Sequence, residues 1–425
     1  MRALRWALAC GLASASVACS SGDPVQAAAE SVATSSQPVS SASTAAPSAS
    51  VLASSMVPGS SGPKPPAAAP RTLACGSEVG CAILSEGRVA CWGYDALGQL
   101  GSGKTEKPRL HPARAVSGLP PASWVAVGLS HVCVLTEGHA VHCWGTSTTG
   151  EVGDGGRLDP DAGVTRVLPP TKVVGLTDHV VALDVSNVHS CAVLEDGRVA
   201  CWGDNTCGGL GADGPASSRP VFVPGITDAV EVAAGSELTC VRSVRGEVTC
   251  WGQEKGKPYG PRAVPGVCAR QLTVSSSMGC ALDCQGQVRC WGDLPGYDNH
   301  ADVPTVIPEL VDIEELRGGH AHVLARDRAG ALYAWGGDDS GQLGRGKPAD
   351  WTDDFATRPV VVPVPWKRTV AVAAGGVITR GDSRYLRPAS YVDAGASCAR
   401  TESGDVYGWG EPNVDYVPKK ITLPR

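Results

Sequence analysis

A segment that ends in Trp-Gly recurs seven times after residue 71, and this repeat limits the fold more than any other feature of the chain. The tryptophans of the seven dipeptides stand 52, 58, 49, 40, 44 and 74 residues apart. Such a period is typical of solenoids and propellers, in which each unit buries its apolar faces against its neighbours. The copies read "CAILSEGRVACWG" (81–93), "CVLTEGHAVHCWG" (133–145), "CAVLEDGRVACWG" (191–203), "CVRSVRGEVTCWG" (240–252), "CALDCQGQVRCWG" (280–292), "LARDRAGALYAWG" (324–336) and "CARTESGDVYGWG" (398–410).

Each copy has the pattern of a β-hairpin. Pairing the two cysteines of the first copy places Val89 opposite Ile83 and leaves residues 85–87 as the loop. A three-residue hairpin loop favours a left-handed last residue, which glycine adopts without a Cβ penalty. In the second copy Gly138 comes one residue early, so a different turn is expected there. The other six copies have a glycine in the loop position: Gly87, Gly197, Gly246, Gly286, Gly330 and Gly404.

Five copies contain Cys-x9-Cys, which predicts cross-strand disulfides. Opposed residues of a non-hydrogen-bonded antiparallel pair have Cα atoms about 4.5 Å apart, within disulfide range. Zinc is the alternative ligand of paired cysteines, but the chain has no Cys-x2-Cys partner and carries an export signal, described below. The sixth copy has Leu324 and Ala334 at these positions, and the seventh has Cys398 opposite Gly408. The predicted pairs are Cys81–Cys91, Cys133–Cys143, Cys191–Cys201, Cys240–Cys250 and Cys280–Cys290.

The remaining cysteines of the repeat region are less regular. Cys268 lies at the start of one expected strand and Cys284 at the far end of the next, so antiparallel pairing brings them together. We therefore expect a Cys268–Cys284 disulfide. The pattern assigns no partner to Cys75, Cys207 or Cys398.

The sequence around the hairpins predicts about four short strands per unit. Strand-like segments such as "WVAVG" (124–128) precede the hairpins, and Pro-Val segments such as "RPVFVPG" (219–225) follow them. No sustained 3.6-residue apolar period occurs after residue 70. The fold class is therefore all-β.

These elements together resemble the repeats of the regulator of chromosome condensation family. Copies of its Trp-Gly and Gly-Gln-Leu-Gly segment include "WGYDALGQLGSG" (92–103), "WGDNTCGGLGADG" (202–214) and "WGGDDSGQLGRG" (335–346). The resemblance covers residues 71–425 and implies a seven-bladed β-propeller, in agreement with the seven Trp-Gly sites. The cysteine pairs are not part of the family pattern and suggest an oxidising compartment.

The two ends of the repeat region suggest how the ring closes. No Pro-Val segment precedes Thr72, whereas the chain ends in "DYVPKKITLPR" after the last Trp-Gly. We expect residues 416–423 to complete the first blade, so that the C-terminal strand closes the propeller over residues 71–425 and few sheet edges remain open.

The N-terminal residues 1–18 have the order of an export signal peptide: arginines, a short apolar run and small residues. The following Cys19 matches a bacterial lipid-attachment site, although Ser16 replaces the usual Leu. Simple cleavage after Ala15 or Ala18, which would give a soluble exported protein, is the alternative. Residues 20–70 contain 14 Ser, 12 Ala and 8 Pro, so residues 19–70 are expected to form a disordered tether.

The segment "GQLGSGKT" (98–105) matches the phosphate-binding loop G-x-x-x-x-G-K-[ST] letter for letter. A true phosphate loop opens a helix, but here Pro108 and Pro112 follow. The equivalent turn later in the chain reads "GQLGRGKP" (341–348), so the repeat accounts for most of the match. We expect no nucleotide binding. The net charge of −6, without a basic run, also argues against nucleic acid as a partner.

No residue pattern predicts catalysis, a metal site or a cofactor. His131, His189 and His322 each stand two residues before the first-cysteine position, where a ring of ligands is less expected than hydrogen bonds to a neighbouring loop. Asp154, Asp159 and Asp161 lie in "GDGGRLDPDAG" (153–163), which lacks the spacing and final Glu of a known calcium loop.

The expected function is that of a non-catalytic, monomeric binding module, held at the bacterial cell envelope by a lipid anchor and mediating protein–protein interaction. Trp351 and Phe355, in the long loop 345–359, are the candidate partner-binding residues, unless they pack against a blade edge. The family includes a nuclear exchange factor for a small GTPase, a role that conflicts with an export signal. It also includes a secreted bacterial inhibitor of β-lactamases. The alternatives are therefore an inhibitor of an extracytoplasmic enzyme or a carbohydrate- or cell-wall-binding propeller.

Overall fold

The computed structural model describes residues 68–424, apart from gaps at 77, 108, 159–165, 177–178, 255–256, 277, 294–299, 339, 347–354, 381–390 and 411–414. The expected signal peptide, Cys19 and nearly all of the expected tether lie outside the described residues. Their assignment stays a prediction.

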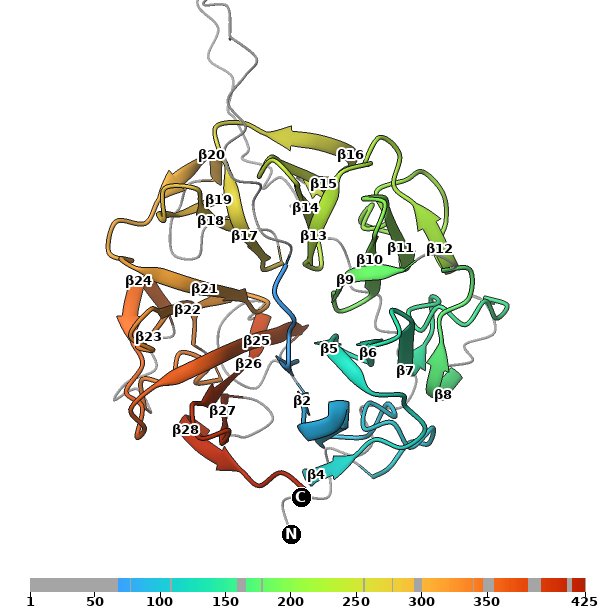
Figure 1. Cartoon of the computed structure of the whole chain (residues 1–425), viewed down its shortest axis with the longest axis horizontal. Helices are drawn as coiled ribbons and strands as arrows, with labels where there is room; N and C mark the ends of the chain where they lie inside the picture. The colour runs from blue at the N-terminus through green and yellow to red at the C-terminus, as the bar shows by residue number, and fades with distance from the viewer. Residues whose placement is uncertain are drawn as a thin grey trace, which may run out of the picture.

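The described chain folds into seven four-stranded antiparallel sheets that radiate from a central axis (Figure 1). Each sheet, here called a blade, consists of four strands consecutive in sequence, from blade 1 (β1–β4) to blade 7 (β25–β28). The only helical element in the described part is one 3₁₀ turn, η1 (Ser85–Gly87), in the first hairpin. The all-β, seven-bladed prediction is confirmed.

The first strand of each blade lies nearest the axis and the fourth lies at the rim (Figure 1). The first strands are β1 (Leu73–Cys75), β5 (Ala122–Val127), β9 (Val180–Val185), β13 (Ala229–Ala234), β17 (Ala269–Val274), β21 (Ile313–Gly318) and β25 (Thr369–Arg380). The second strands are β2 (Val79–Ile83), β6 (His131–Thr136), β10 (His189–Leu194), β14 (Leu238–Ser243), β18 (Met278–Asp283), β22 (His322–Asp327) and β26 (Tyr391–Thr401). The third strands are β3 (Val89–Gly93), β7 (Val141–Ser147), β11 (Val199–Gly203), β15 (Val248–Glu254), β19 (Val288–Asp293), β23 (Leu332–Gly337) and β27 (Val406–Gly410). The fourth strands are β4 (His111–Ala115), β8 (Arg166–Lys172), β12 (Ser217–Phe222), β16 (Lys257–Val264), β20 (His300–Val306), β24 (Phe355–Val361) and β28 (Asp415–Ile421).

The second and third strands form the hairpins that the cysteine spacing predicts. In blade 1, Cys81 pairs with Cys91 and Ile83 with Val89. All five predicted hairpin disulfides are present, with Cα atoms 4.1 Å apart. In the second copy His139 takes the left-handed position itself, with φ 61°, because Gly138 comes one residue too early.

Every rim strand contains proline, which lacks the N–H needed to pair with a further strand. An exposed sheet edge without such protection is a template for aggregation. The repeated proline of the Pro-Val segments therefore protects the outer edge of the disc. The prolines of the rim strands are Pro112, Pro169, Pro170, Pro220, Pro258, Pro261, Pro304, Pro359 and Pro418.

Neighbouring blades are joined by a tryptophan of one blade and the glycine turn of the blade before it. The indole Nε1 of Trp144 donates to the carbonyl oxygen of Gln99 at 2.7 Å, within the segment that resembles a phosphate loop. A Cβ at Gly101, whose φ is 83°, would come within 2.7 Å of Val116 and 3.3 Å of this indole nitrogen. The turn is therefore shaped to receive a tryptophan. Trp202, Trp251 and Trp409 donate in the same way to the carbonyl oxygens of Glu151, Gly209 and Gln342.

Blades 1 and 5 place their tryptophans differently. Trp92 and Trp291 lie opposite Gly80 and Gly279, where a Cβ would come within 2.4 Å of the indole ring. Their indole N–H groups are buried and have no acceptor among the described residues. In the blades that precede them, 7 and 4, only residues 411–414 and 255–256 separate the third strand from the fourth, and these lie outside the described residues.

The expected closure by the C-terminal strand is wrong. β28 pairs with β27 and completes blade 7, while blade 1 is already complete because β4 follows its own hairpin. The lack of a Pro-Val segment before Thr72 was misleading. In every blade the rim strand follows the hairpin of the same blade, so blade 1 needs no strand before Thr72 or from the C-terminus.

Side chains rather than a shared strand close the ring between blades 7 and 1. A disulfide joins Cys75 of β1 to Cys398 of β26, with Cα atoms 6.3 Å apart, a pair to which the sequence pattern assigned no partners. Arg400 of β26 donates to the carbonyl oxygens of Thr72 and Ile83 in blade 1, at 3.2 and 2.9 Å. The Cys268–Cys284 disulfide is confirmed, and Cys207 is buried and also disulfide-bonded.

The disulfide between blades 7 and 1 is expected to stabilise the protein more than a hairpin disulfide does. It closes a sequence separation of 323 residues, against 10 for Cys191–Cys201. In the chain-entropy account this difference amounts to about 3 kcal/mol. Guanidinium unfolding without reductant should show a larger loss for Cys75→Ala/Cys398→Ala than for Cys191→Ala/Cys201→Ala. Equal losses would contradict this prediction.

Candidate functional site

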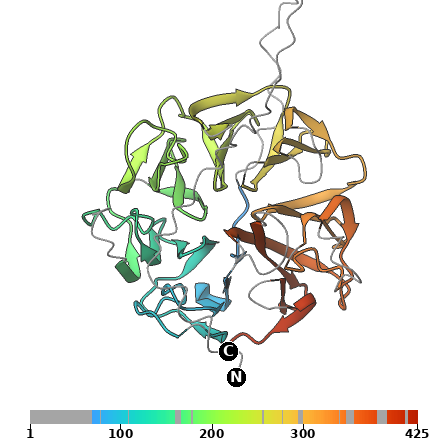
Figure 2. The same ribbon diagram turned by 180° about the vertical axis from the view of Figure 1, so that it is seen from behind.

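The disc has two faces, which differ in the loops that they carry (Figures 1 and 2). Because the strands of each blade alternate in direction, the hairpin turns and the connections between blades lie on one face, here called the turn face. The connections from the first to the second strand and from the third to the fourth lie on the other, here called the loop face. The hairpin turns of the turn face are residues 84–88, 137–140, 195–198, 244–247, 284–287, 328–331 and 402–405.

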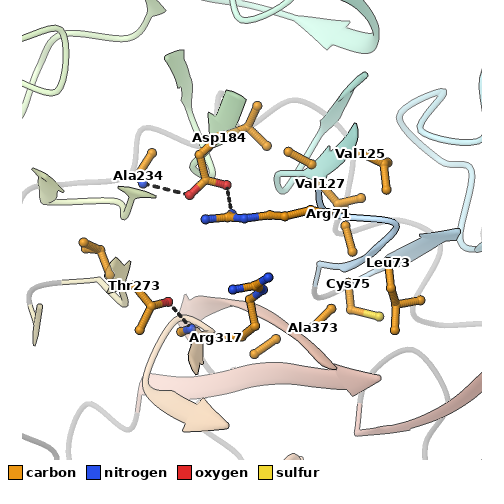
Figure 3. Close-up of a pocket in the computed structure, with 16 residues that line it drawn as sticks. Arg71, Leu73, Cys75, Val125, Val127, Asp184, Ala234, Thr273, Arg317 and Ala373 are labelled. Atoms are coloured by element: carbon orange, nitrogen blue, oxygen red, sulfur yellow. Dashed lines mark hydrogen bonds and ion pairs between the residues drawn. The ribbon is translucent and has the colours of Figure 1, made fainter. Parts of the chain in front are cut away.

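The inner strands surround a central channel, which holds a cavity of about 60 Å³ (Figure 3). Most of its lining is small or apolar, for example Val127, Val274 and Ala373. The charged side chains among the residues that line it are Arg71, Asp184 and Arg317.

An ion pair crosses the channel from blade 1 to blade 3. Arg71 Nη1 lies 2.5 Å from Asp184 Oδ1, and the guanidinium passes over the ring of Trp124 in blade 2, 5.6 Å from its centroid. The second oxygen of Asp184 accepts the backbone N–H of Ala234 at 3.0 Å. Burial raises the pKa of Asp184, and the charge of Arg71 opposes that rise. The pair leaves no wide passage through the centre of the disc.

Two further polar side chains of the inner strands satisfy backbone groups of the next blade. Gln271 accepts the backbone N–H of Leu316 at 3.0 Å, and Thr273 accepts that of Gly318 at 2.5 Å. The inner strand is the open edge of each sheet, so its N–H groups need such partners. Polar residues near the axis therefore serve the joints between blades.

The three repeat histidines also join blades. The Nε2 atoms of His131, His189 and His322 lie 2.9, 2.9 and 3.0 Å from hydroxyl oxygens of the following blade. The acceptors lie on a strand rather than on the expected loop. Burial lowers the histidine pKa values to about 3, 4 and 3, respectively. No group of three or more His, Cys, Asp or Glu side chains suited to a metal ion occurs in the described part of the chain.

The sequence contains a signal for these histidine contacts that the cysteine spacing alone did not reveal. Wherever the position two before the first cysteine is His, the next blade has Ser or Thr one residue before its own first-cysteine position. These partners are Ser190, Thr239 and Ser397. Blades without such a partner have Gly or Val there.

The acidic segment 153–163 lies only partly within the described residues. Asp154 accepts a hydrogen bond from Arg166 Nη1 at 3.3 Å, whereas Asp159 and Asp161 lie outside the described residues. Asp154 is thus engaged by a cation of its own chain.

A hollow with a volume of about 460 Å³ lies on the turn face between blades 5 and 6. We call it the turn-face groove. One wall is the hairpin turn of blade 5, pinned by the Cys268–Cys284 disulfide, and the other is the connection from β20 to β21. Val311 is 66% exposed in that connection, between apolar Leu310 and charged Asp312. Arg270 and Arg328 supply positive charge to the lining of this groove.

The candidate partner-binding residues do not form a site in the described structure. Trp351 lies outside the described residues. Contrary to the expectation of a loop, Phe355 begins β24 and pairs with Gly337 of β23. The Pro-Val strand of blade 6 starts earlier than its proline suggests, so Phe355 belongs to the rim of the disc.

The chain matches known repeats at several places. A family model described as "Regulator of chromosome condensation (RCC1) repeat" matches residues 86–135, 196–242 and 329–379, and a second model of the same description matches residues 180–208. Among curated proteins, Protein pim1 of Schizosaccharomyces pombe is 24% identical over 319 residues, covering 71% of this chain and 52% of pim1. The ultraviolet-B receptor UVR8 of Arabidopsis thaliana is 29% identical over 339 residues, covering 71% of this chain and 74% of the receptor. The chain thus spans about half the length of pim1.

Solved structures agree with the fold. Human WBSCR16 superposes with a TM-score of 0.60 at 22% identity, covering 71% of this chain and 83% of that one. Yeast RCC1 (Prp20), solved bound to Kap60, gives a TM-score of 0.61 at 21% identity, covering 84% and 85%. Among the described residues, no helix is long and apolar enough to cross a bilayer.

The buried histidines predict that acid destabilises the protein. They stay uncharged in the folded chain, whereas in the unfolded chain they take up protons below about pH 6.5. The unfolded state therefore binds more protons between about pH 6.5 and 4, and the free energy of unfolding falls as the pH falls through this window. Replacement of one buried histidine by glutamine should make this loss shallower by about 1.4 kcal/mol per pH unit.

Urea unfolding of His189→Gln at pH 7 and pH 5 measures this effect. The matched control is His179→Gln, whose side chain is 65% exposed. The prediction fails if His189→Gln loses as much stability between the two pH values as the unmodified protein does.

Proposed function

Because this chain is a seven-bladed propeller of regulator of chromosome condensation repeats, we propose that it is a non-catalytic protein-binding module that works outside the cytoplasm. The observation that carries the proposal is the turn-face groove, about 460 Å³ in volume, on a rigid disulfide-linked disc. Its mixture of exposed apolar and charged side chains is the composition of a protein–protein interface.

The relatives support a protein partner. The yeast protein Prp20 is bound to Kap60 in one solved structure, and a second structure of Prp20p is described together with its binding to Gsp1p and histones. A propeller presents loops and turns from several blades on one rigid surface, which suits recognition of a folded protein. Inhibition of an extracytoplasmic enzyme would use the same kind of surface and is a special case of the proposal.

The disulfides support a location outside the cytoplasm. Disulfides form and persist in oxidising surroundings and are rare in the cytosol. Twelve cysteines that form disulfides here are at most 4% exposed, so the bonds are part of the core of the blades rather than surface additions. Together with the signal pattern at 1–18 and Cys19, they favour a lipid-anchored, monomeric protein of the bacterial cell envelope.

A photo-crosslinking residue tests the turn-face groove. Placed at position 311 in the native cell envelope, it should give one dominant crosslinked protein. The same residue at position 361, a rim valine that is 64% exposed, is the control and should give none. Equal crosslinking from both positions, or retention on purified glycan without a crosslinked protein, would contradict the proposal and favour a carbohydrate binder.

Cys19 is tested separately. The unmodified chain should incorporate labelled palmitate and fractionate with membranes, and Cys19→Ala should lose both properties because the thiol is the attachment point. A chain that stays soluble and unlabelled with Cys19 intact would instead indicate simple cleavage after Ala15 or Ala18.

A further inference from the structure

The charges around the central channel are not balanced within it. Asp184 has both oxygens engaged, by Arg71 and by the backbone N–H of Ala234. Arg317, which lines the same cavity from blade 6, has no carboxylate partner inside it. The cavity is thus lined by two guanidinium groups and one carboxylate.

One nitrogen of the Arg317 guanidinium, Nε, has no hydrogen-bond partner among the described residues. Its Nη2 lies 2.9 Å from Glu315 Oε1, and its Nη1 donates to the carbonyl oxygen of Leu316 at 2.8 Å. Its Nε is buried and has no acceptor in the described structure. Glu315 cannot compensate further, because its second oxygen accepts from Arg326 Nε at 3.1 Å. A buried donor of a charged group without an acceptor carries a substantial desolvation cost.

The two guanidinium groups also repel each other across the cavity. Figure 3 shows Arg317 pointing toward Arg71. Burial is the main cause that lowers the pKa of Arg317. The charge of Glu315 raises this pKa, and the positive charge of Arg71 lowers it. Asp184 raises this pKa less than Arg71 lowers it. Both arginine side chains are largely buried, which lowers the local dielectric and strengthens this repulsion.

We propose that the channel binds one small monovalent anion of chloride size between Arg71 and Arg317. The anion accepts the N–H of Arg317 Nε and lies against both guanidinium groups, so it supplies the missing acceptor and reduces their repulsion. The cavity of about 60 Å³ is large enough, since it corresponds to the volume of roughly two water molecules.

A second hollow of about 50 Å³ shares Val127, Ala234 and Gly318 with the channel cavity. It extends to the connections between first and second strands, where Ser186, Ser236 and Ser275 are among its lining. We expect a small ion to enter from this side of the disc.

The bound anion would link blade 6 to blade 1 across the axis, in addition to the pair that links blade 1 to blade 3. Because only the folded chain assembles this site, the anion should stabilise the protein in a saturable manner. Protein binding at the turn-face groove does not depend on it, so the two proposals can fail independently.

Crystals of the full chain soaked in bromide provide the direct test. An anomalous peak within hydrogen-bond distance of Arg317 Nε, in the cavity between the two guanidinium groups, is expected. A channel with no anomalous peak, filled only by water, would overturn the proposal.

Thermal melting provides a second readout in solution. At constant ionic strength, Tm should shift upward and saturate as chloride replaces gluconate, an anion too large for the cavity. Arg317→Met should abolish this dependence, whereas Arg328→Met should keep it, because the Arg328 side chain on the same blade is 77% exposed. Identical melts of the unmodified protein in chloride and gluconate would also overturn the proposal, whether or not Arg317→Met folds.

Discussion

The contact between the tryptophan of one blade and the glycine turn of the blade before it holds this ring together. A four-stranded blade cannot bury both of its faces alone, so it must pack against neighbours on either side. The indole fills the space between two blades, and its N–H satisfies a carbonyl oxygen that the turn would otherwise bury unpaired, as Trp144 does for Gln99. The glycines of the turn are required because a side chain at Gly101 would collide with Val116 and crowd the incoming indole.

Where this contact is absent, the chain uses other means. The tryptophans of blades 1 and 5 lie over Gly80 and Gly279 instead, and their indole N–H groups have no acceptor among the described residues. Two of the disulfides outside the hairpin pattern lie near these junctions: Cys75–Cys398 joins blades 7 and 1, and Cys268–Cys284 ties the start of blade 5 to its own hairpin turn. At the junction of blades 7 and 1 the disulfide is a covalent link between two blades that share no strand.

Hydrogen bonds between neighbouring blades also involve polar side chains near the axis of the disc. The repeat histidines were weighed as ligands in the sequence, yet each bonds to the next blade in the ring, as do Asp184, Gln271 and Thr273. Many buried polar groups near the axis therefore serve the joints between blades. Arg317 differs because its buried Nε has no acceptor among the described residues and a second guanidinium lines the same cavity, and for that reason it carries our anion proposal. The surface offered to a protein partner lies elsewhere, on the turn face, where these joints leave side chains free.

The sequence by itself determined the hairpins, their disulfides, the number of blades and the proline-containing segments that follow the hairpins. These features depend on spacing within about ten residues, and an antiparallel hairpin converts such spacing directly into register, as for Cys81 and Cys91. Only the tertiary structure decided the Cys75–Cys398 bond, the place of β28 in blade 7, the strand position of Phe355 and the meeting of Arg71, Asp184 and Arg317. Cys75 and Cys398 are 323 positions apart, and Arg71 and Asp184 are 113 apart, so their proximity depends on how the ring closes, which no local pattern encodes.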